Sequence, residues 1–191
     1  MTRKILTKKF HDVFAWRSGA GFWYNVRMTI LDKAEWRESA GTPACDVSFI
    51  PPMARRRLTM LEKAALSVAW ALLARHPGDY PVVFASRWGE IATTLKLMRQ
   101  VHDEGEMSPA GFSNSVHNAA PGHLSLLTKS RKPYTAIAAG DRTYEMGLLE
   151  ASHTPGKVLF IYAEEATPAF YRPYAADATE ARACAMLIDN G

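Results

Sequence analysis

The sequence predicts an α/β fold, in which helices cover a sheet of short, apolar strands. Two observations support this fold class. Short apolar runs of strand length, such as residues 80–87 and 157–165, alternate along the chain with longer segments of helical periodicity. Runs of this kind fit strands that are buried on both faces, which is the environment inside a helix-covered sheet. The alternation does not determine the order of the strands.

The overall composition is that of an ordinary globular protein. The 191 residues suffice for a single domain, 1–191, with a substantial core, and 48% hydrophobic with 22% charged residues is a usual balance. The net charge of +4 comes from basic residues spread along the chain, which argues against nucleic acid as a partner but is compatible with an acidic protein. No run of 18 apolar residues predicts a membrane span, and no apolar core of signal-peptide length follows the N-terminus. We therefore expect a cytoplasmic protein.

The first half of the chain contains the clearest helix signal. Residues 13–17 are predicted to form a short strand and residues 30–39 a short helix. After a proline-containing loop, Thr59 and Glu62 have the spacing of a capping box, and apolar residues then recur with helical periodicity up to residue 75. His76, Pro77 and Gly78 end this helix.

The second half repeats the alternation of strand and helix. Apolar runs predict buried strands at residues 80–87, 134–140, 157–165 and 181–189. Helical segments are predicted between them at 89–105, at 107–127 in two pieces, and at 142–152. Pro109 and Pro121 punctuate the divided segment.

A sharp bend is predicted where the strand at 134–140 meets the following helix. Enzymes often place a nucleophile at such a strand-to-helix elbow. Here the bend holds Ala138, Ala139, Gly140 and Asp141, with neither Cys nor Ser. Asp141 could act as a base or nucleophile, but Asp is also a preferred helix cap, and the residue pattern alone favours the cap.

Ser113, Ser115 and His117 form a second candidate for chemistry, because a Ser–His pair can supply a nucleophile and a base. On a helix Ser115 and His117 point to different sides, whereas Ser113 and His117 could meet. Local capping and helix hydrogen bonds are favoured, since no acidic residue stands at a spacing that would orient the histidine. His123, among apolar neighbours, is predicted to be a hydrogen-bonded interior histidine.

Two further sets of residues leave the chemistry open. Arg55, Arg56 and Arg57 could bind a phosphate or an acidic helix, or could be solvated or paired with local carboxylates. Cys45 and Cys184 have no CxxC or zinc spacing, so we expect reduced thiols, no metal site and no cofactor.

Several segments resemble the N-terminal half of β-ketoacyl synthases, in the thiolase-like superfamily. They are RRRLTMLEKAALSVAWALL, VVFASRWGE and FSNSVHNAAPGHLSLLTKSRKPYTAIAAG. The most specific part is Asn118, Gly122 and His123, followed by Lys132 and Pro133. The shorter stretches FIPPMARRRLT, FASRWGE, FSNSVHNAA and YTAIAAG are similar to the chain-length-factor-like ketosynthase subunits of aryl polyene biosynthesis. The resemblance extends from about residue 46 to residue 165.

The resemblance implies a single thiolase-like half, with a mixed five-stranded sheet covered by helices, that lacks the C-terminal half of a full ketosynthase. Active members carry a cysteine at the elbow. An ungapped alignment from Lys132 and Pro133 places Asp141 at that position, and a shift of one or two residues places Gly140 or Ala139 there. The catalytic histidines of the family come from the C-terminal half. The implied subunit therefore has no catalytic residues of its own.

The function implied by the resemblance is that of a non-catalytic, chain-length-factor-like subunit in type II fatty acid or polyketide-like (aryl polyene) biosynthesis. Such a subunit would form a heterodimer with an active β-ketoacyl synthase, shape its acyl tunnel and help to hold an acyl carrier protein with a phosphopantetheine-bound chain. Arg55, Arg56 and Arg57 are possible contacts for the carrier protein. An apolar surface left uncovered in a half-fold would mark the interface. The candidates for the interface or acyl pocket are Phe112, Ser115, Val116, His117, Asn118, Leu124, Leu127 and Ile137.

Two other functions remain alternatives. The chain could be a stand-alone small acyltransferase or hydrolase that uses Ser115 with His117, or Asp141. It could also be a homodimeric acyl-binding or carrier-binding module without a catalytic partner.

Overall fold

A computed structural model describes residues 10–17, 23–39, 44–174 and 180–191. Its centre is a mixed sheet with the strand order β1-β2-β6-β5-β3-β4. β3 runs parallel to β4 and to β5, whereas β6 is antiparallel to β5 and β2. The predicted five-stranded mixed sheet corresponds to β2 through β4 in this order, and β1 pairs antiparallel along the outer edge of β2. The strands are β1 (Phe10–Arg17), β2 (Trp23–Arg37), β3 (Val82–Ala85), β4 (Tyr134–Ile137), β5 (Lys157–Glu164) and β6 (Arg182–Asp189).

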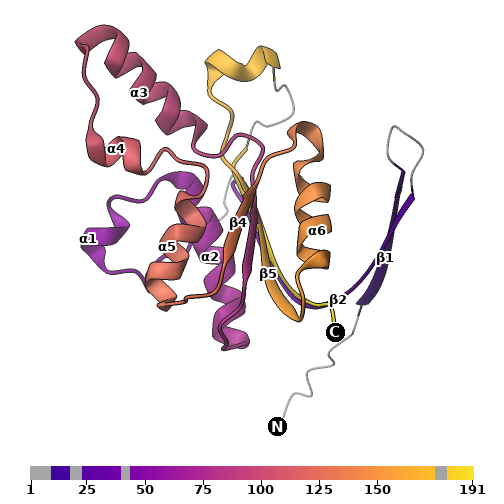
Figure 1. Ribbon diagram of the computed structural model, residues 1–191. Coiled ribbons are helices and arrows are strands. Elements are labelled where there is room, and N and C mark those ends of the chain that lie inside the picture. Colours follow the sequence, from indigo (N-terminus) through magenta and orange to yellow (C-terminus); the bar gives the residue numbers. More distant parts are fainter. Residues whose placement is uncertain (1–9, 18–22, 40–43, 175–179) are drawn as a thin grey trace.

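Helices cover both faces of this sheet (Figure 1). α2 and α5 pack on one face, over a core that includes Leu61, Leu66 and Phe84, and α6 packs on the other, over Val158 and Phe160. The predicted α/β class is therefore confirmed. The helices are α1 (Pro52–Arg55), α2 (Met60–Arg75), α3 (Ile91–Glu104), α4 (Pro109–Ser113), α5 (Ala119–Thr128) and α6 (Thr143–His153), with 3₁₀ turns η1 (Gly140–Arg142) and η2 (Ala169–Tyr174).

The predicted capping box of α2 is present. The Thr59 hydroxyl accepts a hydrogen bond from the Glu62 backbone N–H at 3.1 Å, and the Glu62 carboxylate accepts from the Thr59 N–H at 2.7 Å. Two of the four N–H groups that a helix leaves unpaired at its start are thereby satisfied. This helix supplies the largest share of buried side chains on its face of the sheet.

The helix predicted at residues 30–39 is wrong, because residues 30–37 form the C-terminal half of β2 and no residue of this range is helical. Good helix formers such as Leu31, Lys33 and Glu35 suggested a helix, but the strand is fixed by antiparallel pairing with β6, which lies far away in the sequence. Side chains then alternate with period 2: Lys33 and Glu35 are exposed, while Ala34 and Trp36 pack against the core. Local propensity was overridden by tertiary pairing.

The strand predicted at residues 134–140 exists as β4 but is not buried, because it lies at the edge of the sheet. Tyr134 is 39% exposed, Thr135 is exposed, and Ile137 is half-buried. Sequence alone could not distinguish an edge strand from a central one, since YTAIAAG is as apolar as the central strands. An edge strand has one row of backbone N–H and C=O groups that no other strand of its sheet pairs with.

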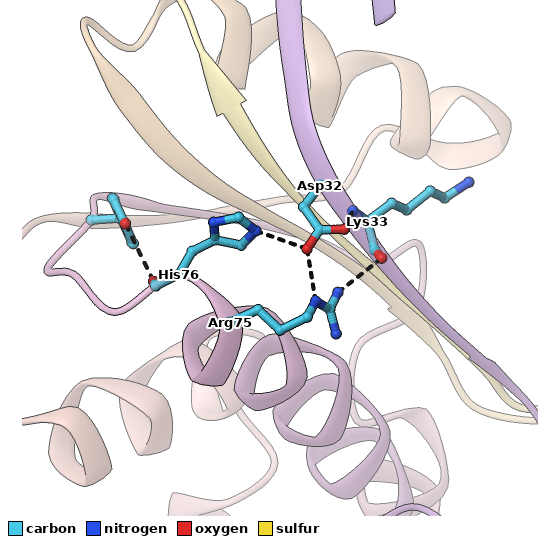
Figure 2. A network of polar contacts seen from close by, with 5 residues as sticks. Asp32, Lys33, Arg75 and His76 are labelled. Carbon is cyan, nitrogen blue, oxygen red and sulfur yellow. Dashed lines mark hydrogen bonds and ion pairs between the residues drawn. The ribbon is translucent and has the colours of Figure 1, made fainter. Parts of the chain in front are cut away.

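A polar network joins the far end of α2 to β2 (Figure 2). Asp32 follows a register shift in the pairing of β2 with β6. One of its carboxylate oxygens accepts a hydrogen bond from Arg75 Nε at 2.7 Å and lies 2.8 Å from His76 Nε2. Arg75 also donates to the carbonyl of Lys33 at 3.1 Å. The network fixes the C-terminal end of α2 against the sheet.

Candidate functional site

The elbow that the sequence predicts is present between β4 and α6. β4 ends at Ile137, whose carbonyl accepts a hydrogen bond from the Ser86 N–H at 3.1 Å. The chain then turns through Gly140, which has a φ of +60° that favours glycine. The Thr143 hydroxyl donates to the Gly140 carbonyl at 2.7 Å and accepts from the Ala139 N–H at 2.9 Å. The turn is thereby held from the first residue of α6.

Asp141 projects from this turn with 83% of its side chain exposed. Its carboxylate lies 2.5 Å from Nη1 of Arg87, which follows the end of β3 and has only 22% of its side chain exposed. The Arg87 guanidinium also lies over the indole ring of Trp88, 5.0 Å from the ring centroid. The Asp141 carboxylate is therefore exposed to solvent and held in an ion pair with Arg87.

The β3–α3 loop beside the elbow is held by two buried glutamates. Glu164 accepts hydrogen bonds from the Arg87 N–H at 2.5 Å and from the Ser86 hydroxyl at 3.2 Å. Glu165 accepts from the Ala92 N–H at the start of α3, at 2.7 Å. The two carboxylates bind different groups and do not act on one common group. Burial raises the pKa of both, and the hydrogen bonds they accept oppose that shift.

A second chain of polar contacts joins α5, α2 and α3. His123 Nδ1 lies 2.8 Å from the carboxylate of Glu62, which is completely buried. His123 is therefore hydrogen-bonded as predicted, but it is half-buried and not interior, with 31% of its side chain exposed. The pKa of His123 is raised by its hydrogen bond to Glu62. From Glu62 the chain continues through the Thr59 hydroxyl, which donates to Glu90 at 2.9 Å. Burial, with the neighbouring charge of Glu62, raises the pKa of Glu90 to about 8.

The candidate Ser–His pair does not form. The Ser115 hydroxyl donates to the carbonyl of Phe112 at 2.8 Å, and the Ser113 hydroxyl donates to that of Pro109 at 3.0 Å. His117 donates from Nε2 to the Ser86 carbonyl at 2.7 Å, under the β3–α3 loop. These are the local hydrogen bonds that the sequence pattern favoured. They give no support to an enzyme based on Ser115 and His117.

The candidate interface residues divide between surface and core. Phe112 and Val116 are 57% and 42% exposed, whereas Leu124 is 2% exposed and belongs to the core beneath α2 and α5. Leu124 therefore offers no surface to a partner, because α5 turns it toward the sheet. Leu126, which the sequence analysis did not single out, is 74% exposed instead. The other candidates are intermediate or exposed: Ser115, His117, Leu127 and Ile137 are half-buried, and Asn118 is exposed.

Further exposed apolar side chains surround these residues. Met98, Val101 and Met107 lie on α3 and just after it, and Tyr134 lies on the edge strand β4. The helices α3, α4 and α5 lie on the same side of β4 (Figure 1). We call this set the interface surface: Met98, Val101, Met107, Phe112, Val116, Leu126 and Tyr134. Exposed apolar side chains that gather on neighbouring elements are typical of a contact with another molecule.

The three consecutive arginines adjoin the same region. Arg56 and Arg57 are exposed, and Arg55 is half-buried with its Nε lacking a hydrogen-bond partner. The Asn114 side-chain amide donates to the Arg57 carbonyl at 3.2 Å. This contact fastens the arginine run to the segment between α4 and α5.

A cavity that the sequence analysis missed lies between the start of α6 and the open face of the sheet. Its volume is about 540 Å³. The lining comes from five separate parts of the chain, which explains why no local motif revealed it. We call it the α6 cavity, and its polar and aromatic lining includes Glu35, Arg37, Arg87, Asp141, Tyr144, Glu145, Tyr162, Arg182 and Cys184.

The cysteines do not supply a nucleophile. Burial raises the pKa of both Cys45 and Cys184 to about 11, so each remains a protonated thiol at neutral pH. Within the residues that the structure describes, no three His, Cys, Asp or Glu side chains come together as a metal site. None of the helices described is both long and apolar enough to cross a bilayer.

Comparison with known proteins gives a family match over most of the chain. The family model of the β-ketoacyl synthase N-terminal domain matches residues 31–191. Among solved structures, a chain in the complex of the ketosynthase ApeO with its chain length factor ApeC, from Xenorhabdus doucetiae, is 25% identical with a TM-score of 0.75. That match covers 86% of this chain and 79% of the other, so the two are of similar length. Curated proteins gave no match.

Two other complexes share the fold at lower identity. The ishigamide ketosynthase/chain length factor is 17% identical with a TM-score of 0.62, over 78% of this chain and 48% of that one. AntDE:AntF, a type II PKS acyl-carrier protein in complex with its ketosynthase bound to the hexaketide, is 14% identical with a TM-score of 0.62, over 75% and 50%. The chain thus spans about half the length of these two relatives.

Proposed function

We propose, on the premise that this chain belongs to the β-ketoacyl synthase family and has the N-terminal half of its thiolase-like fold, that it is a non-catalytic, chain-length-factor-like subunit. In this role it forms a heterodimer with a catalytic β-ketoacyl synthase and supplies part of the wall of the acyl tunnel. The pathway class is type II fatty acid or polyketide-like synthesis, of the aryl polyene kind. The growing chain would arrive on the phosphopantetheine arm of an acyl carrier protein.

The observation that carries this proposal is the elbow. The turn after β4 has the geometry that presents a nucleophile, yet the positions that could align with the cysteine of the family hold Ala139, Gly140 or Asp141. Of these, Asp141 forms an ion pair with Arg87. No histidine in the described part of the chain hydrogen-bonds to this carboxylate, and burial raises the pKa of both thiols to about 11. The elbow therefore serves as scaffold, and the reactive sulfur has to come from another molecule.

The interface surface supports a permanent partner. Its exposed apolar side chains lie next to the edge strand β4, whose outer backbone groups are available for pairing. Obligate interfaces commonly bury more than about 2,000 Å² and are more apolar than transient ones. The similar length of the matched chain in the ApeO–ApeC complex supports a short ketosynthase-like chain as one member of a pair.

Co-expression with a full-length ketosynthase encoded next to this chain tests the proposal. We expect a stable heterodimer that elutes as one species and withstands dilution to micromolar concentration. Phe112→Glu should weaken the pair by at least tenfold, because it buries a charge in the interface. Phe170→Glu is the matched control, since Phe170 is 61% exposed, against 57% for Phe112, and lies on η2 outside the interface surface.

Two outcomes would contradict the proposal. One is a monodisperse monomer that ignores the ketosynthase in size-exclusion chromatography. The other is covalent loading of this chain alone by an acyl carrier protein, measured by intact-protein mass spectrometry. A homodimer that persists in the presence of the ketosynthase would instead support the acyl-binding module considered from the sequence.

A further inference from the structure

The α6 cavity has the size and position of a small-molecule site. Its volume of about 540 Å³ lies within the range of roughly 300–1,000 Å³ that is usual for ligand pockets. It opens where β3 and β4 end, since Arg87 follows β3 and Gly140 and Asp141 follow β4. Ligands of α/β proteins commonly bind beyond the carboxyl ends of the parallel strands. On the face of the sheet that α6 covers, the space beside the start of α6 is therefore a cavity and is not filled by side chains.

Two arginines face each other directly at the rim of this cavity. Arg37 on β2 and Arg182 on β6 are register partners in an antiparallel pair, so their side chains leave the same face of the sheet. Like charges at directly opposite positions are destabilising, unless an anion lies between them. Within the described part of the chain, the Arg37 side chain is exposed and forms no hydrogen bond or ion pair, and Arg182 Nε is buried without a hydrogen-bond partner.

The carboxylates that line the cavity have other partners. Asp141 is paired with Arg87, and Glu35 lies 2.5 Å from Lys33 Nζ. Glu145 lies in the first turn of α6, where the helix dipole favours a negative charge. Glu164 is the register partner of Arg182 on the opposite strand, but its oxygens accept from the Ser86 hydroxyl and the Arg87 N–H. Glu164 is thus the buried carboxylate next to Arg182, and within the described residues Arg37 has no carboxylate partner.

The wall beside the arginines is aromatic. Tyr144 and Tyr162 contact each other edge to face, with ring centroids 5.3 Å apart. The Arg182 guanidinium lies 5.8 Å from the Tyr162 ring centroid, and its Nη2 donates to the Tyr162 hydroxyl at 3.3 Å. The Tyr162 hydroxyl is also hydrogen-bonded to the side chain of Glu164. Such a wall accommodates the organic part of a ligand while the guanidinium groups bind its anionic end.

We infer that the α6 cavity binds a small organic phosphate monoester, with Arg37 and Arg182 on the phosphate and Tyr144 and Tyr162 against the organic part. Guanidinium groups bind phosphate through paired N–H donors, and a dianionic phosphate offers three terminal oxygens to two adjacent forks. A carboxylate offers only two oxygens and one charge. This site is independent of the proposed subunit role, because it is built entirely from one chain.

Titration calorimetry of the isolated chain with phenyl phosphate tests the inference, with benzoate and inorganic phosphate as comparison ligands at constant ionic strength. We expect phenyl phosphate to bind at least tenfold more tightly than either, because only this ligand uses both the arginines and the aromatic wall. Arg37→Gln should weaken its binding at least tenfold. Arg99→Gln, an exposed arginine on α3 away from the cavity, should leave binding unchanged.

Arg182→Gln should also weaken binding, but Arg182 is half-buried, so its thermal unfolding midpoint has to be measured beside its affinity. Arg37 is exposed, and its substitution keeps the test decisive if the Arg182 variant fails to fold. The inference is overturned if phenyl phosphate does not bind at millimolar concentration, if benzoate binds equally well, or if Arg37→Gln binds like the wild type. None of these results would alter the co-expression experiment above.

Discussion

The carboxylate of Asp141 lies 2.5 Å from Nη1 of Arg87, at the turn where an active ketosynthase carries its cysteine. The two residues come from the ends of adjacent parallel strands, β4 and β3. The ion pair therefore links the turn after β4 to the loop after β3. With 83% of the Asp141 side chain exposed, the pair contributes little to stability, because exposed ion pairs are weakened by water and salt.

Asp141→Asn tests whether this carboxylate has a chemical role. We expect the free energy of unfolding to change by less than about 1 kcal/mol, as for other exposed ion pairs. We also expect the condensing activity of the heterodimer to change by less than about twofold, because a scaffold residue makes no contact with reacting atoms. Urea denaturation and product formation by the purified complex are the two measurements. A loss of activity of more than tenfold with unchanged stability would assign Asp141 to catalysis.

Elements whose signals are local were predicted correctly from the sequence. Thr59 and Glu62 stand three residues apart, and their capping box needs no contact from elsewhere. The elbow was likewise readable, because a short strand, a Gly-containing bend and a helix follow one another directly. By contrast, residues 30–37 were misassigned because only pairing with β6 makes them a strand. Edge exposure of β4 is also a property of the sheet and not of its sequence.

The candidate site shows the same limit. Glu62 was recognised as a cap, but its complete burial and its contact with His123 depend on the packing of α5 against α2. Arg37 and Arg182 are far apart in the sequence and meet only through the register of β2 and β6. Leu124 and Leu126 are equally apolar, and only the rotation of α5 decides which of them is exposed. Residue type alone gave no signal for any of these placements.

Protonation of Asp32 is expected to lower the free energy of unfolding at acidic pH. Burial alone would raise its pKa, but the hydrogen bonds from Arg75 and His76 outweigh burial and lower the pKa to about 2 (Figure 2). Because the pKa is depressed in the folded state, the contribution of the network is complete above the unfolded value of about 4 and is lost between about pH 4 and pH 2. Each unit by which the pKa is lowered corresponds to about 1.4 kcal/mol of stability, and partial solvent exposure reduces this contribution. We therefore expect Asp32→Asn to lower the free energy of unfolding by about 1–2 kcal/mol at pH 7.

Urea denaturation of wild type and Asp32→Asn at several pH values measures this contribution. The difference in the free energy of unfolding should stay constant from pH 7 to pH 5 and shrink toward pH 2. Asp103→Asn, an exposed carboxylate at the end of α3, is the control and should show no such trend. A constant difference down to pH 2 would show that the charge of Asp32 is not what stabilises the network.

For Glu90 we predict a pH dependence of the free energy of unfolding opposite to that of Asp32. Burial and the charge of Glu62 raise its pKa to about 8, so the folded protein retains this proton where the unfolded chain loses it. Stability should therefore fall as the pH rises from about 4.5 to 8. Glu90→Gln keeps an acceptor for the Thr59 hydroxyl and has no charge to bury. We expect this variant to be more stable than the wild type by at least about 1 kcal/mol at pH 8 and by much less at pH 5.

Thermal or urea unfolding at pH 5 and pH 8 provides the comparison. Glu104→Gln serves as control, because Glu104 is an exposed glutamate at the C-terminal end of α3, the helix that Glu90 precedes. If Glu90→Gln is less stable than the wild type at pH 8, then Glu90 is ionised in the folded protein and has a cationic or donor partner that compensates its charge.

Two helical glycines should respond oppositely to alanine. A Cβ at Gly147 on α6 would lie 2.7 Å from the Cβ of Ala85 and 2.8 Å from a ring carbon of Phe160. Gly147→Ala therefore forces α6 away from the sheet, and overpacking of this kind costs about 1–3 kcal/mol. At Gly122 on α5 the nearest atom is the Tyr134 hydroxyl at 3.6 Å, an ordinary contact. Gly122→Ala should stabilise by up to about 1 kcal/mol, because alanine is the better helix former.

Denaturation curves of the two variants decide this point, and each serves as the control for the other. Equal effects of the two substitutions would mean that the close approach of α6 to β3 and β5 is not maintained in solution. The Gly147 variant should also perturb the α6 cavity, since Tyr144 and the elbow belong to the same helix start.

The arginine run predicts how the acyl carrier protein is held. Arg56 and Arg57 are exposed and are fastened to the segment before α5 through the contact of Asn114 with the Arg57 carbonyl. Positively charged groups placed beside an interface accelerate and strengthen binding of an acidic partner. The double variant Arg56→Glu/Arg57→Glu should weaken binding of the phosphopantetheinylated carrier protein to the heterodimer by at least tenfold, and the residual binding should lose most of its salt dependence. Biolayer interferometry at low and high salt measures both effects.

Arg99→Glu introduces a charge reversal at another exposed position and should change the affinity by less than twofold. If the carrier protein binds the double variant as tightly as the wild type, its docking site lies elsewhere. The heterodimer should remain intact in the double variant, because these arginines lie outside the interface surface.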